Sequence, residues 1–278
     1  GKRKSSPNHY DAFTILLVNG NSLYDRKKEE SISAGEDTYG NVKNKQNTIG
    51  LGHRHIWNQN AYSSTSISIS KQNANAIFYE NQSDTVSLRT NDIFRTLNAR
   101  QINHIQFNKT LSSVFGFEIQ NRNLEYDFFL NNVNSKNDVI VTNLSSFITI
   151  KSILVRKALI SIGSRINWNN FERDILIAPR INIDFSLSKG WGNLIINSGR
   201  YFQNPPEKYL SVVEKNDLRS INTIQHSLTF EKLITSSTKF SISVYEKKYD
   251  NAPMMERNQI FTDPTFLLDQ LRTYRNII

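Results

Sequence analysis

The stretch Ala158-Leu159-Ile160-Ser161-Ile162-Gly163-Ser164-Arg165-Ile166-Asn167-Trp168 alternates between two kinds of side chain along its whole length. Successive side chains of a β-strand point to opposite faces, so this period of two predicts a strand with one apolar face. Even-numbered positions carry mainly apolar side chains, while odd-numbered positions include Ser161, Gly163, Arg165 and Asn167. The stretch is longer than the roughly five or six residues of an ordinary globular strand, and suits the roughly nine to eleven that cross a bilayer at a tilt.

The same alternation recurs in both directions from this stretch and predicts about eleven antiparallel strands. We expect them near residues 11–19, 47–57, 61–71, 99–107, 110–130, 138–150, 157–168, 177–188, 192–203, 220–232 and 238–250. Short turns are expected near 58–60, 108–109, 151–156, 189–191 and 233–237. Long polar loops are expected near 20–46, 72–98, 131–137, 169–176 and 204–219, and again from 251. Short turns at one end and long loops at the other are typical of an all-β, antiparallel transmembrane β-barrel meander.

Composition removes several other classes of protein. The 278 residues contain no cysteine, which excludes disulfides, thiolate catalysis and zinc–thiolate sites. No apolar run is long enough for a membrane-spanning helix. The net charge of +9 comes from scattered basic residues, as on a solvated polar face. A phosphate-binding glycine loop, an H-E-x-x-H motif and a nucleophile elbow are all missing from the sequence, so we predict neither an enzyme nor a cofactor.

The predicted strands indicate a part of a barrel rather than a whole one. An odd number of strands does not close a bacterial barrel, and two unpaired edges in lipid would leave backbone groups unsatisfied. We therefore expect residues 1–278 to form one partial barrel domain, with strands missing. Trp57, Trp168 and Trp191 fall near expected strand ends, where an interfacial aromatic girdle would place them.

Four segments carry motifs of a known family. The run Asn197-Ser198-Gly199-Arg200-Tyr201-Phe202-Gln203-Asn204-Pro205-Pro206, followed by Tyr209-Leu210, resembles the G-x-Y-x-Q-x-P…L signature of TonB-dependent receptor barrels. Pro179-Arg180-Ile181-Asn182-Ile183 is similar to the P-R-h-x-h strand of that family, where h is apolar. The segment around His226 resembles A-x-H-x-x-h-G but departs from it at Ser227-Leu228-Thr229. Tyr245-Glu246-Lys247-Lys248-Tyr249-Asp250-Asn251-Ala252-Pro253 is close to Y-Y-K-K-Y-D-N-h-P. The resemblance is specific over about 175–255.

This resemblance implies a bacterial outer-membrane receptor with a 22-stranded barrel, filled by an N-terminal plug. Such receptors import a scarce nutrient, namely a siderophore, cobalamin or a glycan. The implied partners are the lipid bilayer and lipopolysaccharide, the receptor's own plug, the inner-membrane TonB complex and a small nutrient ligand, with no nucleic acid. The sequence shows no plug and no TonB-contacting segment, and about half of a barrel is present.

Several side chains are candidates for more than a structural role. The ligand-contact candidates are Tyr201, Gln203, Arg165, Arg180 and Tyr245. The family landmarks are Gly199, Tyr201, Gln203, Pro205, Tyr245, Lys247 and Tyr249. Lumen charges, which would hold a plug, guide a ligand or form interstrand ion pairs, are expected at Arg165, Arg180, Asp184, Arg200, Glu231 and Lys247. Arg200 shares the parity of Leu194 and Ile196, so it can face outward only by extending to the membrane interface.

His53 and His55 share one strand face, and we expect both on the polar lumen wall. No third ligand with matching spacing is visible, so no metal site is predicted. We expect loop tips that contact an extracellular ligand at Tyr39, Tyr79, Phe94 and Phe261.

Two other functions stay open on the sequence. One is an outer-membrane barrel of a different class, a passive porin or an assembly and secretion pore, which a plug domain would exclude. The other is a soluble, basic β-sandwich that binds carbohydrate or nucleic acid, with its apolar faces buried against each other.

Overall fold

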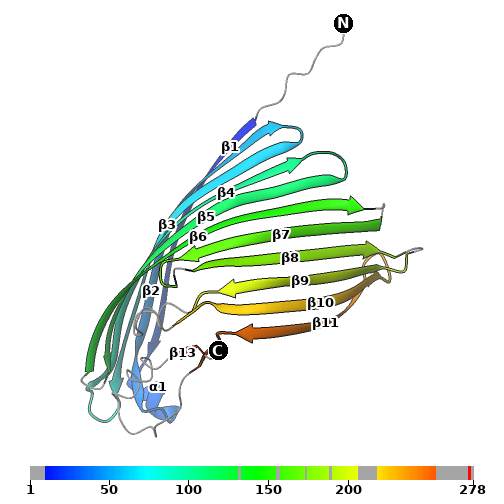
Figure 1. Ribbon diagram of the computed structural model, residues 1–278. Coiled ribbons are helices and arrows are strands. Elements are labelled where there is room, and N and C mark those ends of the chain that lie inside the picture. Colours follow the sequence, from blue (N-terminus) through cyan, green and yellow to red (C-terminus); the bar gives the residue numbers. More distant parts are fainter. Residues whose placement is uncertain are drawn as a thin grey trace.

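A single eleven-stranded antiparallel sheet dominates the computed structural model, which describes residues 10–130, 133–154, 157–172, 174–187, 190–205, 218–254 and 275–276. Each strand pairs with its neighbours in sequence, in the order β1 to β11, so the sheet is a meander (Figure 1). This confirms the predicted all-β class and the number of strands. Among the described residues, no helix is long and apolar enough to cross a membrane.

The elements follow the chain without a crossover. The first six strands are β1 (Tyr10–Arg26), β2 (Thr38–Asn58), β3 (Ala61–Glu80), β4 (Val86–Gln106), β5 (Leu111–Leu130) and β6 (Val133–Leu154). The next five are β7 (Ala158–Asn169), β8 (Ile175–Ser186), β9 (Asn193–Gln203), β10 (Ile221–Leu233) and β11 (Lys239–Asp250). A short helix α1 (Lys28–Ser33) joins β1 to β2, and β12 (Pro253–Met254) pairs with β13 (Arg275–Asn276) as a separate small sheet.

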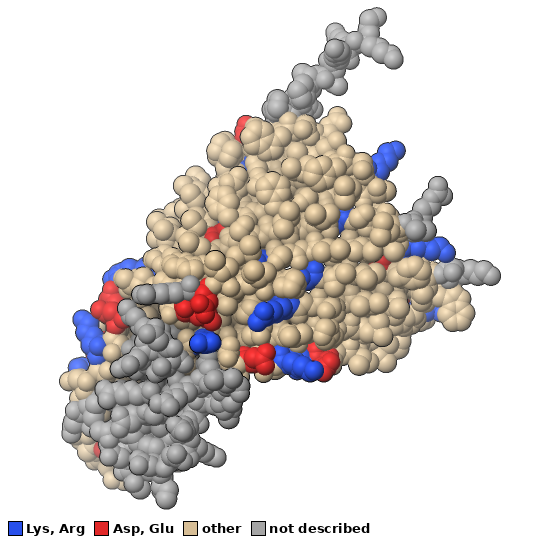
Figure 2. Space-filling view, in the orientation of Figure 1, with Lys and Arg blue, Asp and Glu red and all other residues tan. Residues whose placement is uncertain are grey.

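The strands pair in register, so the apolar residues of one strand lie beside those of its neighbours on the same face of the sheet. Ile162 on β7 lies between Ile150 on β6 and Ile181 on β8. The side of the sheet that carries these three residues is called the apolar face below, and the opposite side the polar face. The Ile162 side chain is 56% exposed, and many large apolar side chains on the other strands are also exposed. The viewed side of the sheet is largely free of charged residues over its upper part (Figure 2).

Strand lengths correct the predicted loops. Strands β1 to β6 contain 17 to 22 residues, whereas β7 to β11 contain 11 to 13. Most of the expected loops 20–46 and 72–98 therefore form paired strand, and the expected contrast between short turns and long loops is wrong at these hairpins. These segments are rich in Asn, Ser and Lys, which have low β-propensity. Cross-strand pairing overrides that propensity, as where Lys43 on β2 lies in register with Asn75 on β3.

The aromatic residues expected at loop tips lie in these extended strands instead. Tyr39 and Tyr79 face each other in register on β2 and β3, with ring centroids 5.4 Å apart. Phe94 packs edge-on against Tyr126 at 5.7 Å. Each ring is therefore held by a cross-strand neighbour, so the prediction of free loop tips is wrong for these residues. Phe261 lies outside the described residues.

Tryptophans mark the strand ends, as predicted. Trp57 and Trp168 are the penultimate residues of β2 and β7, and Trp191 lies in the connection between β8 and β9. Trp57 is also the residue skipped in the pairing of β2 with β3, at an irregularity between Ile56 and Asn58.

A small core forms on the polar face of the extended strands. Leu124 on β5 and Val141 on β6 are buried together with Phe171 and Leu218, from the connections after β7 and before β10. Phe171 and Leu218 thus pack over the polar face of the sheet. Burial beside this core raises the pKa of Tyr126 to about 12 and that of Asp92, its partner in register, to about 6.

The Asp92 carboxyl makes stability depend on pH. Its proton is bound more tightly in the folded state than in the unfolded chain, where the reference pKa is 3.8. Its contribution to stability is therefore full below about pH 4 and is lost as pH rises through about 6. We expect Asp92→Asn to raise the Tm of the detergent-solubilised protein at pH 8 and to have a smaller effect at pH 5.

Asp138→Asn is the control, because Asp138 is an exposed carboxylate on β6, two strands from Asp92 on β4. Equal changes in Tm at both pH values for Asp92→Asn would contradict a buried, protonated carboxyl.

Candidate functional site

Polar side chains from five consecutive strands line a cavity of about 630 Å³ on the polar face. Its position follows from parity, because every second residue of β5 to β9 projects to this side. The lining includes Glu118, Gln120 and Arg122 on β5, Asn143 and Ser145 on β6, Arg165 and Asn167 on β7, Arg180 on β8 and Gln203 on β9. A smaller neighbouring cavity shares Arg165 and Arg180 and adds Arg100, Phe147 and Tyr201. The two cavities together are called the arginine cleft.

Arg165 is held in place by three strands. Its Nη2 donates to Glu118 Oε2 on β5 at 3.1 Å and to Ser145 Oγ on β6 at 2.8 Å. Its Nε donates to Asn167 Oδ1 at 2.7 Å on its own strand. The ion pair with Glu118 is partly buried. Arg165 therefore acts as a cross-strand tie and offers only part of its charge to a ligand.

Arg180 is placed differently, between two glycines. Gly163 on β7 and Gly199 on β9 are its partners in register, so no side chain flanks it on either strand. The guanidinium carbon lies 4.4 Å from the centroid of the Tyr201 ring, which is a cation–π contact. Among the described residues, the structure records no carboxylate partner for Arg180. Its charge therefore faces the cleft.

Gly199 is needed for this arrangement. A Cβ atom there would lie 3.0 Å from Arg180 Cγ and 3.3 Å from Tyr201 Cε2. A Cβ on Gly163 would meet the Ile148 carbonyl oxygen at 2.7 Å. The P-R and G-x-Y motifs thus form one packed unit, in which the glycine leaves room for the arginine to lie against the tyrosine.

The outer rim of the cleft is tied by hydrogen bonds between distant segments. Asn204, which follows Gln203, donates to Asn143 Oδ1 on β6 at 2.7 Å. Glu172 accepts from the Ser220 backbone at 3.1 Å and from its hydroxyl at 2.6 Å. Pro205 is fully buried at this rim, while Pro206, Tyr209 and Leu210 lie outside the described residues.

The remaining candidates are not brought into the cleft. Tyr245, Lys247 and Tyr249 lie on the edge strand β11, where the Lys247 ammonium is 5.4 Å from the Tyr245 ring centroid. Glu231 pairs with Lys239 across β10 and β11 at 2.7 Å. Asp184 projects to the polar face of β8 but lines neither cavity. Arg200 projects to the apolar face, as its parity predicts, and donates from Nε to Asn222 Oδ1 at 2.8 Å.

Sequence reasoning missed the contribution of β4 to β6. Arg100, Glu118, Arg122 and Asn143 line the cleft, yet none was a candidate. The available signal was parity within 99–107, 110–130 and 138–150, where apolar residues such as Phe115, Phe117 and Ile119 alternate with the polar ones.

His53 and His55 lie on the apolar face, so the prediction that they line the polar wall is wrong. They share parity with Leu51 and Ile49, which pair with Ile15 and Leu17 on β1. The structure also supplies a third potential ligand, Asp11 on the neighbouring strand, which no spacing along the sequence could reveal.

Comparison by sequence finds no matching family model and no matching curated protein. Comparison with solved structures finds many matches. The FpvAI–pyocin S2 complex matches 96% of this chain at 9% identity and a TM-score of 0.70, over 42% of its own length. The siderophore receptor PirA from Acinetobacter baumannii matches 91% at 12% identity and a TM-score of 0.68, over 42% of its length. The ferric citrate transporter FecA matches 87% at 11% identity and a TM-score of 0.63, over 41% of its length.

The chain therefore spans about two fifths of the length of these structures. The neighbours are receptors and transporters rather than enzymes, and they are TonB-dependent outer-membrane receptors. The family resemblance carried by the motifs of β8 to β11 is confirmed at the level of fold, because the eleven-stranded meander has the fold of a segment of a TonB-dependent receptor barrel.

Proposed function

We propose that this chain is part of the barrel wall of a bacterial outer-membrane receptor that imports a scarce nutrient with energy from the TonB complex. The observation that carries the proposal is a sheet with the receptor-barrel fold whose two faces differ in chemistry. Exposed apolar side chains cover one face, and the arginine cleft lies on the other. In a barrel wall these faces meet lipid and lumen, respectively.

The proposal places residues 1–278 within a larger closed barrel. In the described part, β1 and β11 each pair on one side only. An open sheet edge in lipid leaves backbone groups without partners, and closure by further strands satisfies them. A plug inside the barrel, the TonB complex and the lipid and lipopolysaccharide of the outer membrane are the partners that this assignment implies.

The arginine cleft favours an anionic ligand. Its larger cavity is lined by three arginines, Arg122, Arg165 and Arg180, against the single carboxylate of Glu118. Arg165 neutralises Glu118, so the positive charge of Arg180 remains available to a ligand. Guanidinium groups bind carboxylates and phosphates through paired hydrogen bonds. Ferric siderophores that carry carboxylate or catecholate groups fit this charge better than a neutral glycan, and a plug loop with acidic residues would occupy the same cleft in the empty receptor.

Arginine substitutions on the two faces of β7 test the membrane orientation. We expect Ile162→Arg to reduce the folded protein recovered from outer membranes, because a charged residue facing lipid near the midplane costs about 2–4 kcal/mol. We expect Ser161→Arg to be tolerated, since Ser161 lines the cleft on the polar face. The measurement is membrane fractionation followed by electrophoresis with and without boiling, which separates folded from unfolded barrels. Equal recovery of both variants, or a protein that is soluble without detergent, would contradict the assignment.

Uptake assays test the import function. In a strain that expresses the full-length protein, we expect accumulation of at least one labelled probe among ferric citrate, ferric catecholate, ferric hydroxamate and cobalamin, and no accumulation when TonB is deleted. For an anionic probe, we expect Arg180→Ala to weaken binding by roughly 10- to 100-fold, the usual loss for a hydrogen bond to a charged group. Gly199→Ala should weaken it in the same direction by displacing Arg180.

Arg200→Ala is the matched control, because this arginine is three strand positions from Gln203 but projects to the apolar face. Uptake that persists without TonB would favour a passive porin. Unchanged uptake in the Arg180→Ala strain would exclude the cleft as the ligand contact.

A further inference from the structure

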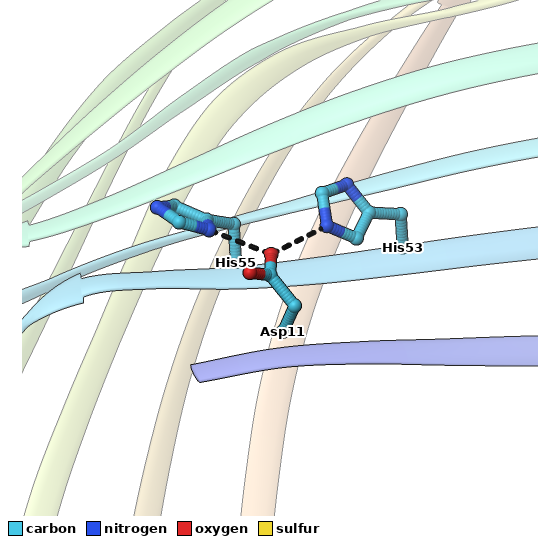
Figure 3. A group of neighbouring side chains, drawn as sticks. All are labelled: Asp11, His53 and His55. Carbon is cyan, nitrogen blue, oxygen red and sulfur yellow. Dashed lines mark hydrogen bonds and ion pairs between the residues drawn. The ribbon is translucent and has the colours of Figure 1, made fainter. Parts of the chain in front are cut away.

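Three side chains that can bind a metal ion converge on the apolar face, near the start of β1 and the end of β2, beside the turn from β2 to β3. Asp11 on β1 and His53 and His55 on β2 point toward one another (Figure 3). His53 Nε2 lies 2.8 Å from Asp11 Oδ1, and His55 Nδ1 lies 2.7 Å from the same oxygen atom. The three ligand atoms all lie within 4.8 Å of one another. They are called the Asp–His–His cluster.

Neighbouring rings hold both imidazoles in these orientations. Phe13 stacks on His53, with centroids 4.6 Å apart and an interplanar angle of 14°. Trp57 meets His55 edge-on at 4.2 Å, and its indole N–H donates to the Ser63 hydroxyl. Each imidazole therefore packs against an aromatic ring, which limits its rotation.

The two strands supply the ligands by register. His53 and His55 are two residues apart on β2, so their side chains project from the same face. Asp11 is the direct partner of His55 across the β1–β2 ladder. A strand-to-strand geometry of this kind brings a carboxylate to the two imidazoles without any turn or loop. β1 pairs only with β2 in the described part of the sheet, so an ion here would link it to its one neighbour through side chains as well as backbone.

We propose that the Asp–His–His cluster binds a divalent transition-metal ion. The preferred ion is Zn²⁺, which does not change its oxidation state. Two imidazoles and one carboxylate match the donor set of three-ligand zinc sites, in which water takes the fourth position. The ligand atoms of a tetrahedral zinc site lie about 3.3 Å apart, given bonds of roughly 2.0–2.1 Å. The Asp11 oxygen must therefore withdraw by about half an ångström from the two nitrogen atoms. The His53 and His55 nitrogens, which lie within 4.8 Å of each other, must move closer together, and the exposed side chains of Asp11 and His53 allow these shifts.

Access for the ion and for a water ligand is open. The side chains of Asp11 and His53 are 47% and 40% exposed, whereas His55 is 21% exposed. The cluster lies beyond the apolar residues Leu51 and Ile15 toward the strand end, next to Trp57, where a barrel wall meets the aqueous interface. A site at this position differs in face and in strands from the arginine cleft, so it does not depend on the import function proposed above.

Metal titration of the full-length protein in detergent tests this inference. After treatment with a chelator, the protein is titrated with Zn²⁺ alone, by calorimetry, and with Co²⁺ alone, by visible absorption. We expect a single Zn²⁺ site and the strong d–d absorption of four-coordinate Co²⁺. We expect His55→Gln and Asp11→Asn each to weaken Zn²⁺ binding by more than the ~10- to 100-fold that loss of an outer-shell partner causes.

His226→Gln is the matched control. His226 is also a histidine on the apolar face and hydrogen-bonds a side chain, Ser198, across strands at 3.0 Å. This variant should bind Zn²⁺ as the native protein does. Heat-modifiable electrophoresis shows whether each variant is folded, and the Co²⁺ spectrum of the native protein tests the site without any substitution.

Three results would overturn the inference. The first is a Co²⁺ spectrum equal to that of the hydrated ion, and the second is Zn²⁺ affinity in His55→Gln equal to the native value. The third is loss of Zn²⁺ binding in His226→Gln with the cluster intact. Any of these would leave Asp11, His53 and His55 as a hydrogen-bonded cluster only.

Discussion

An unbroken register of backbone hydrogen bonds is the constraint on which the rest of the structure depends. Side chains alternate with a period of two, so a slip of one residue between neighbouring strands would move every apolar side chain to the opposite face. The pairings from β1 to β11 keep one parity across the sheet, and the irregularities at Ile56/Asn58 and Phe78/Tyr79 lie close to strand ends. The apolar face, the arginine cleft and the Asp–His–His cluster all follow from this one parity.

Alternation within a strand was readable from the sequence, and strand length was not. The predicted strands from 157 to 250 agree with β7 to β11 within about two residues, because apolar residues alternate there with polar ones. In β1 to β4 the outer segments carry Asn, Ser and Lys on both faces, as in 43–47, and no period marks them as strand. Their pairing depends on a hairpin partner, and neither partner shows a signal by itself. For the same reason the sequence predicts loops at Tyr39 and Tyr79, although each is the other's cross-strand neighbour.

For the cleft, the sequence again predicts only those features that depend on a single strand, namely the face to which each side chain projects. Parity alone put Arg165 and Arg180 on the polar face, and the family motifs drew attention to Tyr201 and Gln203. The contact that gives Arg180 its role joins three strands, since Gly163 and Gly199 flank it and Tyr201 supports it. The register between neighbouring strands determines such contacts, and this register cannot be read from a single sequence. For His53 and His55 the polarity of imidazole predicts the polar face, whereas their shared parity with Leu51 puts them on the apolar face.

A polar cluster on an apolar face is consistent with the fold because of where it lies along the strands. Charged groups cost most at the middle of a bilayer and little at its interfaces, so Asp11 is tolerable only at the end of β1. The mutual hydrogen bonds of Asp11, His53 and His55 reduce the cost of placing them beside Phe13 and Trp57. The cluster and the arginine cleft occupy opposite faces and share no side chain. The free-energy effects of substitutions at the two sites should therefore be additive. Metal binding and ligand uptake are then separable properties of the same barrel wall.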